Sequence, residues 1–145
     1  MTPFLVKSYD GGENWVQFDI WPIVEGDNAC ESIAFDPFDS QTVYIGMEGK
    51  VIKSTNGGYD WEIILEDDFD IWGMRVSNHN SQIVYATSHQ RNIYEDLLLY
   101  ISNDGGQSWD SVNGGFGRRM TLCLEYRALS EADELYLGTF GDGVF

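Results

Sequence analysis

Carboxylates are the side chains with the greatest potential for chemistry in this sequence. Aspartate and glutamate together number 24, against 8 lysines and arginines, and the net charge at pH 7 is −16. Two carboxylates about 5 to 10 Å apart can act as acid and base, or as acid and nucleophile, on a glycosidic bond. Acidic residues occur along the whole chain, so the sequence does not single out such a pair. We therefore assign no catalytic residue.

The acidic balance also bears on partners and metals. Nucleic acids and anionic membranes are recognised mainly through Lys and Arg, so we do not expect this chain to bind nucleic acid. No apolar run reaches the roughly 20 residues of a membrane span, so we do not expect insertion into a membrane either. Residues 66–68 and Asp70 form an acidic run without the ligand spacing and glycine of a calcium loop. Cys30 and Cys123 lie in apolar strand patterns and are expected to be buried free thiols. We expect no metal and no cofactor.

Three octets in the chain share one spacing of residue types. They begin at Ser8, Ser54 and Ser102, and each has Asp or Asn third, glycines fourth and fifth, and tryptophan eighth. The interval from each octet to the next is nearly constant. Its length is typical of one four-stranded propeller blade.

Each residue type in the octet suits a tight turn between two strands. The Asp or Asn side chain can accept hydrogen bonds from backbone N–H groups ahead of it, and the second glycine can take a positive φ. The serine hydroxyl can tie the strand end to the turn, and the tryptophan opens the next strand with a large apolar face to bury. The predicted turn residues are Ser8, Asp10, Gly12, Trp15, Ser54, Asn56, Gly58, Trp61, Ser102, Asp104, Gly106 and Trp109.

The strands that position these turns follow from a second repeated element, which is a strand, a polar turn and another strand. It occurs at 35–44, at 76–85 and, more loosely, at 126–136. The fold class is therefore all-β, a single propeller segment of about three blades made of four-stranded antiparallel sheets. We predict full blades over 31–65 (strands 31–35, 42–46, 50–54, 61–65) and 71–112 (strands 71–76, 82–87, 97–102, 109–112), and half blades over 1–20 (strands 4–8, 15–19) and 120–145 (strands 120–127, 134–137, 143–145).

These octets resemble the Asp-box, or bacterial neuraminidase, repeat. Phe35-Asp-Pro37, Val43-Tyr44-Ile-Gly46 and Gly138-Thr139 make the chain most similar to sortilin-like and xyloglucanase-like propellers, and photosystem II assembly factors carry similar repeats. The family includes sialidases, endoglucanases, sorting receptors and assembly factors, so the resemblance implies a fold rather than one activity. It implies that the octet turns lie opposite the ligand face. It favours an extracellular or periplasmic location, and the chain carries no signal peptide pattern, so the compartment stays unassigned.

The residues of the enzymatic members are not matched. A sialidase requires an arginine cluster for the substrate carboxylate and a tyrosine nucleophile, and the arginines of this chain form no recognisable triad pattern. A xyloglucanase resemblance implies an Asp-Ile-Gly-Gly-type segment where this chain has Met47-Glu48-Gly49. We therefore favour a non-catalytic binding or scaffold module for a protein or a glycan. The alternatives are a fragment of a xyloglucanase-like or sialidase-like glycoside hydrolase, and a purely structural segment.

The ligand face of such a propeller is built by the loops at 20–30, 47–49, 66–70, 88–96, 113–119 and 140–142. One of these loops is enlarged, because the segment from Tyr85 to Ser102 is clearly longer than its counterpart from Tyr44 to Ser54. Long loops on a rigid scaffold frequently carry function. The candidate ligand-binding residues are Trp21, Glu48, Trp72, His89, Arg91, Tyr94, Arg118 and Arg119.

The predicted half blades bear on assembly. Propellers use about 4 to 8 blades, and about three blades leave sheet edges bare, which are templates for pairing with another strand. We expect completion either by a second copy, in a homodimer of about six blades, or by further sequence of a longer chain.

Overall fold

The computed structural model describes residues 4–20, 29–89, 99–112, 121–130, 132–139 and 143–144. Every regular element in these residues is a β-strand. The strands are β1 (Phe4–Lys7), β2 (Val16–Asp19), β3 (Cys30–Phe35), β4 (Val43–Ser54), β5 (Glu62–Val76), β6 (Val84–His89), β7 (Leu99–Ser102), β8 (Asp110–Val112), β9 (Thr121–Ala128), β10 (Asp133–Thr139) and β11 (Gly143–Val144).

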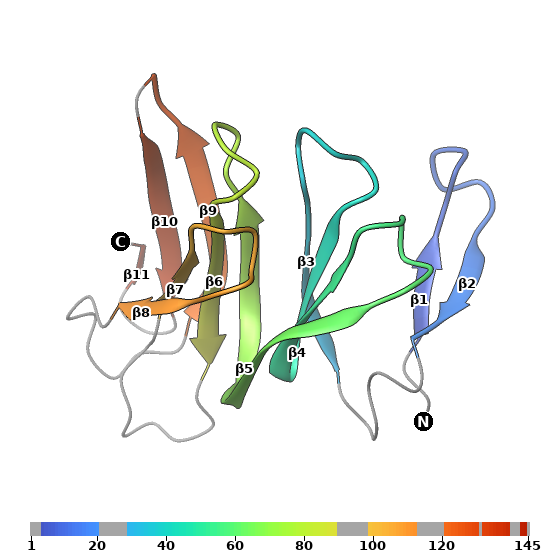
Figure 1. Cartoon of the computed structure of the whole chain (residues 1–145), viewed down its shortest axis with the longest axis horizontal. Coiled ribbons are helices and arrows are strands. Elements are labelled where there is room, and N and C mark those ends of the chain that lie inside the picture. Colours follow the sequence, from blue (N-terminus) through green and yellow to red (C-terminus); the bar gives the residue numbers. More distant parts are fainter. Residues whose placement is uncertain are drawn as a thin grey trace.

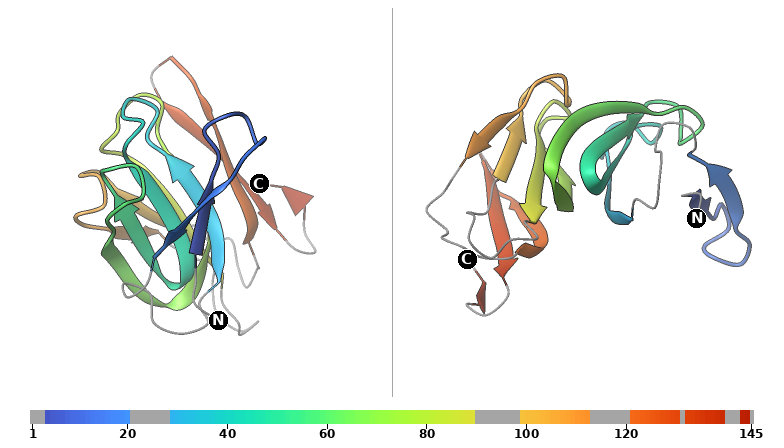
Figure 2. Two further views of the ribbon diagram at one scale, coloured as in Figure 1. Left: turned by 90° about the vertical axis from the view of Figure 1, so that its right-hand side faces the viewer. Right: turned by 90° about the horizontal axis from the view of Figure 1, so that it is seen from below.

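The strands form three antiparallel sheets that follow one another along an open arc (Figure 1). The sheets contain β1-β2, β3 to β8 in sequence order, and β11-β10-β9. Figure 2 shows β1 and β2 at one end of the arc and β9 to β11 at the other. Every pair of neighbours in a sheet is also consecutive in the sequence. This is the arrangement expected when short turns connect successive antiparallel strands.

Two strands are longer than the sequence predicts. β4 covers the strands expected at 42–46 and 50–54, and β5 covers those expected at 61–65 and 71–76. The first half of β4 pairs with β3 and the second half with β5, whose own second half pairs with β6. Residues 47–49 and 66–70, expected as loops, are therefore strand. Register shifts in the β4–β5 pairing and a positive φ of 72° at Gly49 bend the strands without ending them.

The buried apolar residues form three clusters that hold the sheets together. The largest contains Tyr44, Val51 and Met74 among others, and all its residues belong to the six-stranded sheet. Partly buried side chains of the same region, such as Ile64 and Trp109, pack against it. A second cluster includes Trp61, against which Leu5 of β1 packs, so it joins the first sheet to the second. The third joins β6 to the last sheet through Tyr85, Leu124 and Leu137.

Each octet closes on the same two hydrogen bonds. The hydroxyl of its serine accepts from the N–H of the second glycine at 2.7, 2.9 and 2.8 Å in the three octets in order. The side-chain oxygen of its third residue accepts from the N–H of the seventh residue at 2.9, 2.8 and 2.8 Å. Both glycines of every octet have positive φ, between 72° and 98°. The sequence predicts these donors and acceptors.

The third and seventh residues of each octet also bond to each other through their side chains. Asn14 donates to Asp10 at 2.7 Å, and Asn56 donates to Asp60 at 2.7 Å with the two residue types exchanged. In the last octet the Ser108 hydroxyl donates to Asp104 at 2.5 Å. In each octet one of these two positions supplies the donor and the other the acceptor, and the order differs between octets.

The three octet tryptophans differ in burial. Trp61 is 8% exposed and Trp109 is half-buried, whereas Trp15 is 61% exposed. The prediction that all three bury their faces is wrong for Trp15. Trp61 is covered by Leu5, and Trp109 by Ile64, which are residues of the preceding repeat. In the described part of the chain, no strand precedes β1 to cover Trp15 in the same way.

Replacing Ser102 by alanine leaves the buried N–H of Gly106 without its acceptor. We expect the free energy of unfolding to fall by about 2 kcal/mol, the usual cost of a buried unsatisfied donor. The matched control is Ser8→Ala, which removes the same bond in an exposed octet where water can replace it, and which should cost less than about 0.5 kcal/mol. Urea denaturation measures both free energies of unfolding. Equal decreases in the two variants would contradict the view that burial of the Gly106 N–H makes the Ser102 bond important.

Hydrogen bonds from Ser108 and Ser102 hold the pKa of Asp104 at about 2, below its usual 3.8. The folded carboxyl therefore binds its proton more weakly than the unfolded one. The stabilisation that it provides is complete above the usual pKa and is lost as the pH falls through about 2. We expect a carboxyl NMR titration to show that midpoint. Asp104→Asn should keep the turn, as Asn56 does, and remove its sensitivity to acid; an unshifted midpoint would contradict this account.

Candidate functional site

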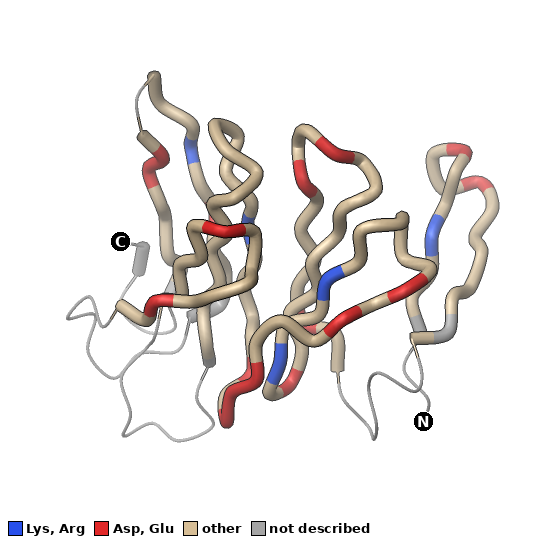
Figure 3. The backbone as a smooth tube through the Cα atoms, viewed as in Figure 1, with Lys and Arg blue, Asp and Glu red and all other residues tan. Residues whose placement is uncertain are grey.

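The candidate site lies where β3 begins and where β4 and β5 bend, at the bottom of Figure 1 and away from the β3–β4 turn. Figure 3 shows acidic residues of β4 and β5 together at this end. Glu48 of β4 is paired in register with Asp70 of β5. Glu31 of β3 is close enough for both carboxylates to act on its charge. Three adjacent strands therefore bring three carboxylates together, which we call the carboxylate cluster.

The members of the carboxylate cluster differ in exposure. Asp70 is buried, Glu48 is half-buried and Glu31 is exposed. Partial desolvation, and the negative charges of Asp70 and Glu48, raise the pKa of Glu31 above its usual range. Glu31 therefore takes up a proton more readily than an isolated glutamate. A carboxyl of this kind, next to other carboxylates, can donate a hydrogen bond or a proton to a ligand.

The bend of β5 beside the carboxylate cluster is tied to β7. The Tyr100 hydroxyl donates a short hydrogen bond to Asp67. Burial, followed by this bond to a carboxylate, raises the pKa of Tyr100 well above its usual value. Tyr100 therefore stays protonated, so its role here is to position the bend and not to act as a phenolate nucleophile.

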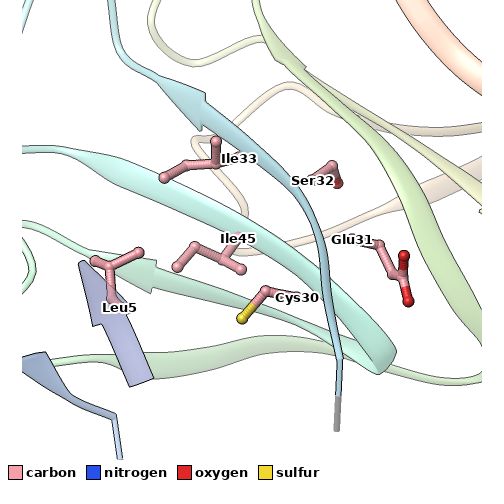
Figure 4. Close-up of a pocket in the computed structure, with 6 residues that line it drawn as sticks. All are labelled: Leu5, Cys30, Glu31, Ser32, Ile33 and Ile45. Atoms are coloured by element: carbon pink, nitrogen blue, oxygen red, sulfur yellow. The ribbon is translucent and has the colours of Figure 1, made fainter. Parts of the chain in front are cut away.

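A pocket of about 270 Å³ opens beside the carboxylate cluster, between β1 and β3. Figure 4 shows that Glu31 points away from the apolar side chains that line it. The Ser32 hydroxyl is directed to the backbone, because it donates to the carbonyl oxygen of Ile71 at 3.2 Å. The pocket therefore suits a small apolar group. Its lining residues are Leu5, Cys30, Glu31, Ser32, Ile33 and Ile45.

Cys30 is the thiol of this pocket. Desolvation and the neighbouring Glu31 carboxylate raise its pKa, so it remains a protonated thiol and is not an activated nucleophile. Cys30 and Cys123 are both free, as predicted, but both are exposed, so the prediction that they are buried is wrong. Cys30 is the first residue of β3, and both it and the next residue, Glu31, are exposed.

The structure places only some of the predicted ligand-binding residues. Glu48 lies at the bend of β4, opposite Asp70, and Trp72 is half-buried in β5 two residues further on. His89 ends β6 and its backbone is also paired with Asp70. Sequence reasoning missed Glu31, and only cross-strand register could have joined it to the other two carboxylates. The predicted residues that lie outside the described part of the chain are Trp21, Arg91, Tyr94, Arg118 and Arg119.

Two further kinds of site bear on function, a metal-binding group and a membrane-spanning helix. These residues contain no group of three or more His, Cys, Asp or Glu that could hold a metal ion. Within the same ranges, no helix is long and apolar enough to cross a membrane.

Comparison with known proteins shows the fold. The sequence matches no protein family model and no curated protein. Among solved structures, the chain is similar to a crystal structure of an ancestral GH74 enzyme, with a TM-score of 0.65 and 21% sequence identity. The similarity covers 79% of this chain and 16% of that enzyme, so the chain spans a small part of its length. It confirms the predicted fold class: the chain is an all-β, antiparallel, partial β-propeller.

Proposed function

We propose that this chain is a non-catalytic binding segment of a β-propeller, and that it recognises a glycan at the carboxylate cluster. The observation that carries the proposal is the meeting of Glu31, Glu48 and Asp70 from three adjacent strands. Carboxylates accept hydrogen bonds from sugar hydroxyls. The similarity to a glycoside hydrolase fold supports the choice of a glycan.

A second candidate function is that of a glycoside hydrolase fragment. The raised pKa of Glu31 beside two other carboxylates favours it, because a glycosidase needs one protonated and one ionised carboxyl at the scissile bond. Under this alternative Glu31 is the acid, and Asp70 or Glu48 is the second carboxyl of the pair. We rank it second because the sequence lacks the Asp-Ile-Gly-Gly-type segment at 47–49.

One experiment separates the two candidates. The purified chain is titrated with xyloglucan oligosaccharides by calorimetry, and the same mixtures are assayed for new reducing ends. We expect saturable binding without hydrolysis, and a loss of affinity of about tenfold or more in Glu31→Gln, since a charged hydrogen bond is removed. Turnover that disappears in Glu31→Gln would support the hydrolase instead. Absence of any glycan binding, together with capture of a cationic protein, would contradict both.

The stability of Glu31→Gln provides the folding control. Because the folded state holds the Glu31 proton more tightly than the unfolded state, stability is highest below the usual glutamate pKa and falls as the pH rises through the raised pKa. Glutamine removes the repulsion from Asp70 and Glu48. We therefore expect the variant to melt at a higher temperature than the wild type at neutral pH, and at a similar temperature in acid. A lower melting temperature at neutral pH would contradict the carboxylate cluster.

A further inference from the structure

Each octet after the first contacts the same position of the preceding repeat. The residue ten positions after the octet serine is Phe18, Ile64 and Val112 in the three repeats (18 minus 8, 64 minus 54, 112 minus 102). Phe18 meets the ring of Tyr59, in the second octet, edge to face with centroids 5.3 Å apart. The backbone oxygen of Ile64 accepts from the Trp109 indole N–H of the third octet at 3.1 Å. By this equivalence Val112 marks the surface on which a further octet would pack. We call each of these three positions a seat.

A lysine strengthens the first two of these seats. Lys7, just before the first octet, donates to the carbonyl oxygen of Gly57 in the second octet at 3.3 Å. Lys53, just before the second octet, donates to the equivalent oxygen of Gly105 in the third at 2.8 Å. The residue at this position in the third repeat is Ile101. The third seat thus has an apolar residue where the other two have an ammonium group.

The seat at Val112 is empty in the described residues. Val112 is 40% exposed, and no octet lies on it. In the same way the first octet has no seat: Trp15 is 61% exposed, and Val6 is 46% exposed although its counterpart Ile52 is fully buried. Figure 2 shows the strands that carry these residues, β1 and β2 on one side and β8 on the other, near opposite ends of the arc.

The open edge of β10 fits the same pattern. β6 pairs with β7 so that Tyr85 lies opposite Ile101, the residue just before the third octet. Tyr136 is the counterpart of Tyr85 on β10, and β10 pairs with β11 only at Gly138 and Thr139. In the described residues no strand pairs with 133–137 on this edge. Tyr136 is accordingly 37% exposed, whereas Tyr85 is buried.

We propose that a second copy of this chain occupies these surfaces, with its first octet seated on Val112 and its β1 paired to the open edge of β10. The repeat geometry fixes the register: Lys7 of the second copy lies opposite Tyr136, and its Trp15 covers Val112. In this register Leu5 and Phe4 of the second copy take the places opposite Gly138 and Thr139 that β11 holds in the single chain. Both halves of the contact belong to one chain and lie near opposite ends of the arc, so two copies can satisfy each other head to tail. The seat at Val112 lacks one hydrogen bond, because Ile101 cannot donate the bond that Lys7 and Lys53 provide at the other two seats.

Light scattering and sedimentation on the purified chain, over a range of concentrations, test this proposal. We expect self-association to at least twice the 16.5 kDa chain mass, and tighter association in added salt, because salt screens the repulsion between copies of net charge −16. Val112→Asp should abolish the association. Phe38→Asp, an equally drastic change at a 63% exposed residue of the β3–β4 turn, should not.

A loss of association in Val112→Asp could also arise from misfolding, so a second variant with the opposite expected effect is needed as a control. Ile101→Lys restores the missing ammonium group and should tighten association about tenfold at each contact, the effect of one charge-assisted hydrogen bond. The melting temperature of each variant at low concentration shows that it is folded. A monomer at all concentrations overturns the proposal, as does self-association that is insensitive to both Val112→Asp and Ile101→Lys.

Discussion

Replacing Gly46 by alanine is expected to lower the free energy of unfolding by about 3 kcal/mol, the upper part of the range for an overpacked core. A Cβ atom at this position would lie 2.4 Å from the Ser32 hydroxyl and 2.5 Å from the carbonyl oxygen of Ile71. The second atom belongs to the backbone of β5, so relief requires β4 and β5 to move apart. Guanidinium denaturation measures the loss.

The control for this substitution is Gly11→Ala in the first octet. A Cβ on Gly11 meets nothing within 4 Å, but its φ is +75°, so the change carries only the conformational cost of about 1 kcal/mol. A similar loss for the two variants would show that the close approach at Gly46 has no energetic weight.

The close approach at Gly46 connects the fold to the candidate site. Ser32 and Ile71, the two residues that crowd Gly46, directly follow Glu31 and Asp70 in the sequence. A side chain at position 46 would hold β3 and β5 apart and would separate these carboxylates. The pKa of Glu31 should then fall toward its usual value in any Gly46→Ala protein that remains folded, because Asp70 contributes to its elevation.

The turns and the strand order could be predicted from the sequence because they depend on local chemistry. A serine, an Asp or Asn, and two glycines at fixed spacing specify the hydrogen bonds of one turn, whatever surrounds it. Two such turns separated by the length of one blade, with a strand-turn-strand pattern between them, then specify the strand order. These features need no knowledge of distant residues.

Two features could not be predicted in the same way. One is the fusion of predicted strands into the long strands β4 and β5, and the other is the carboxylate cluster. Polar runs such as 66–70 look like loops in sequence, but pairing of Lys50 with Glu66, and of Asp70 with His89, keeps them extended. Glu31 and Asp70 are far apart in the sequence, and their proximity depends on the register of β3, β4 and β5. Register is a property of the folded sheet, and acidic residues are too frequent in this chain to reveal it.

Replacing Trp61 by alanine is expected to cost about 4 kcal/mol of unfolding free energy, within the range for truncation of a buried tryptophan. Its ring fills the contact between the first two sheets, where Leu5 packs, and its indole N–H donates to the carbonyl oxygen of Gly58 at 3.0 Å. Trp15 occupies the same octet position, makes the same kind of bond to Gly12 at 3.1 Å, and is exposed. Trp15→Ala should therefore cost less than about 0.5 kcal/mol at concentrations where the chain is monomeric.

The Trp61 and Trp15 pair separates what an octet contributes by itself from what its neighbour contributes. The internal hydrogen bonds of the two turns are alike, so any difference in unfolding free energy measures the burial provided by the preceding repeat. Denaturant melts at low and high protein concentration complete the comparison. If a second copy covers Trp15, the cost of Trp15→Ala rises with concentration, while the cost of Trp61→Ala does not. Equal costs for both variants at low concentration would show that the octet tryptophans stabilise the turn itself and not the contact between blades.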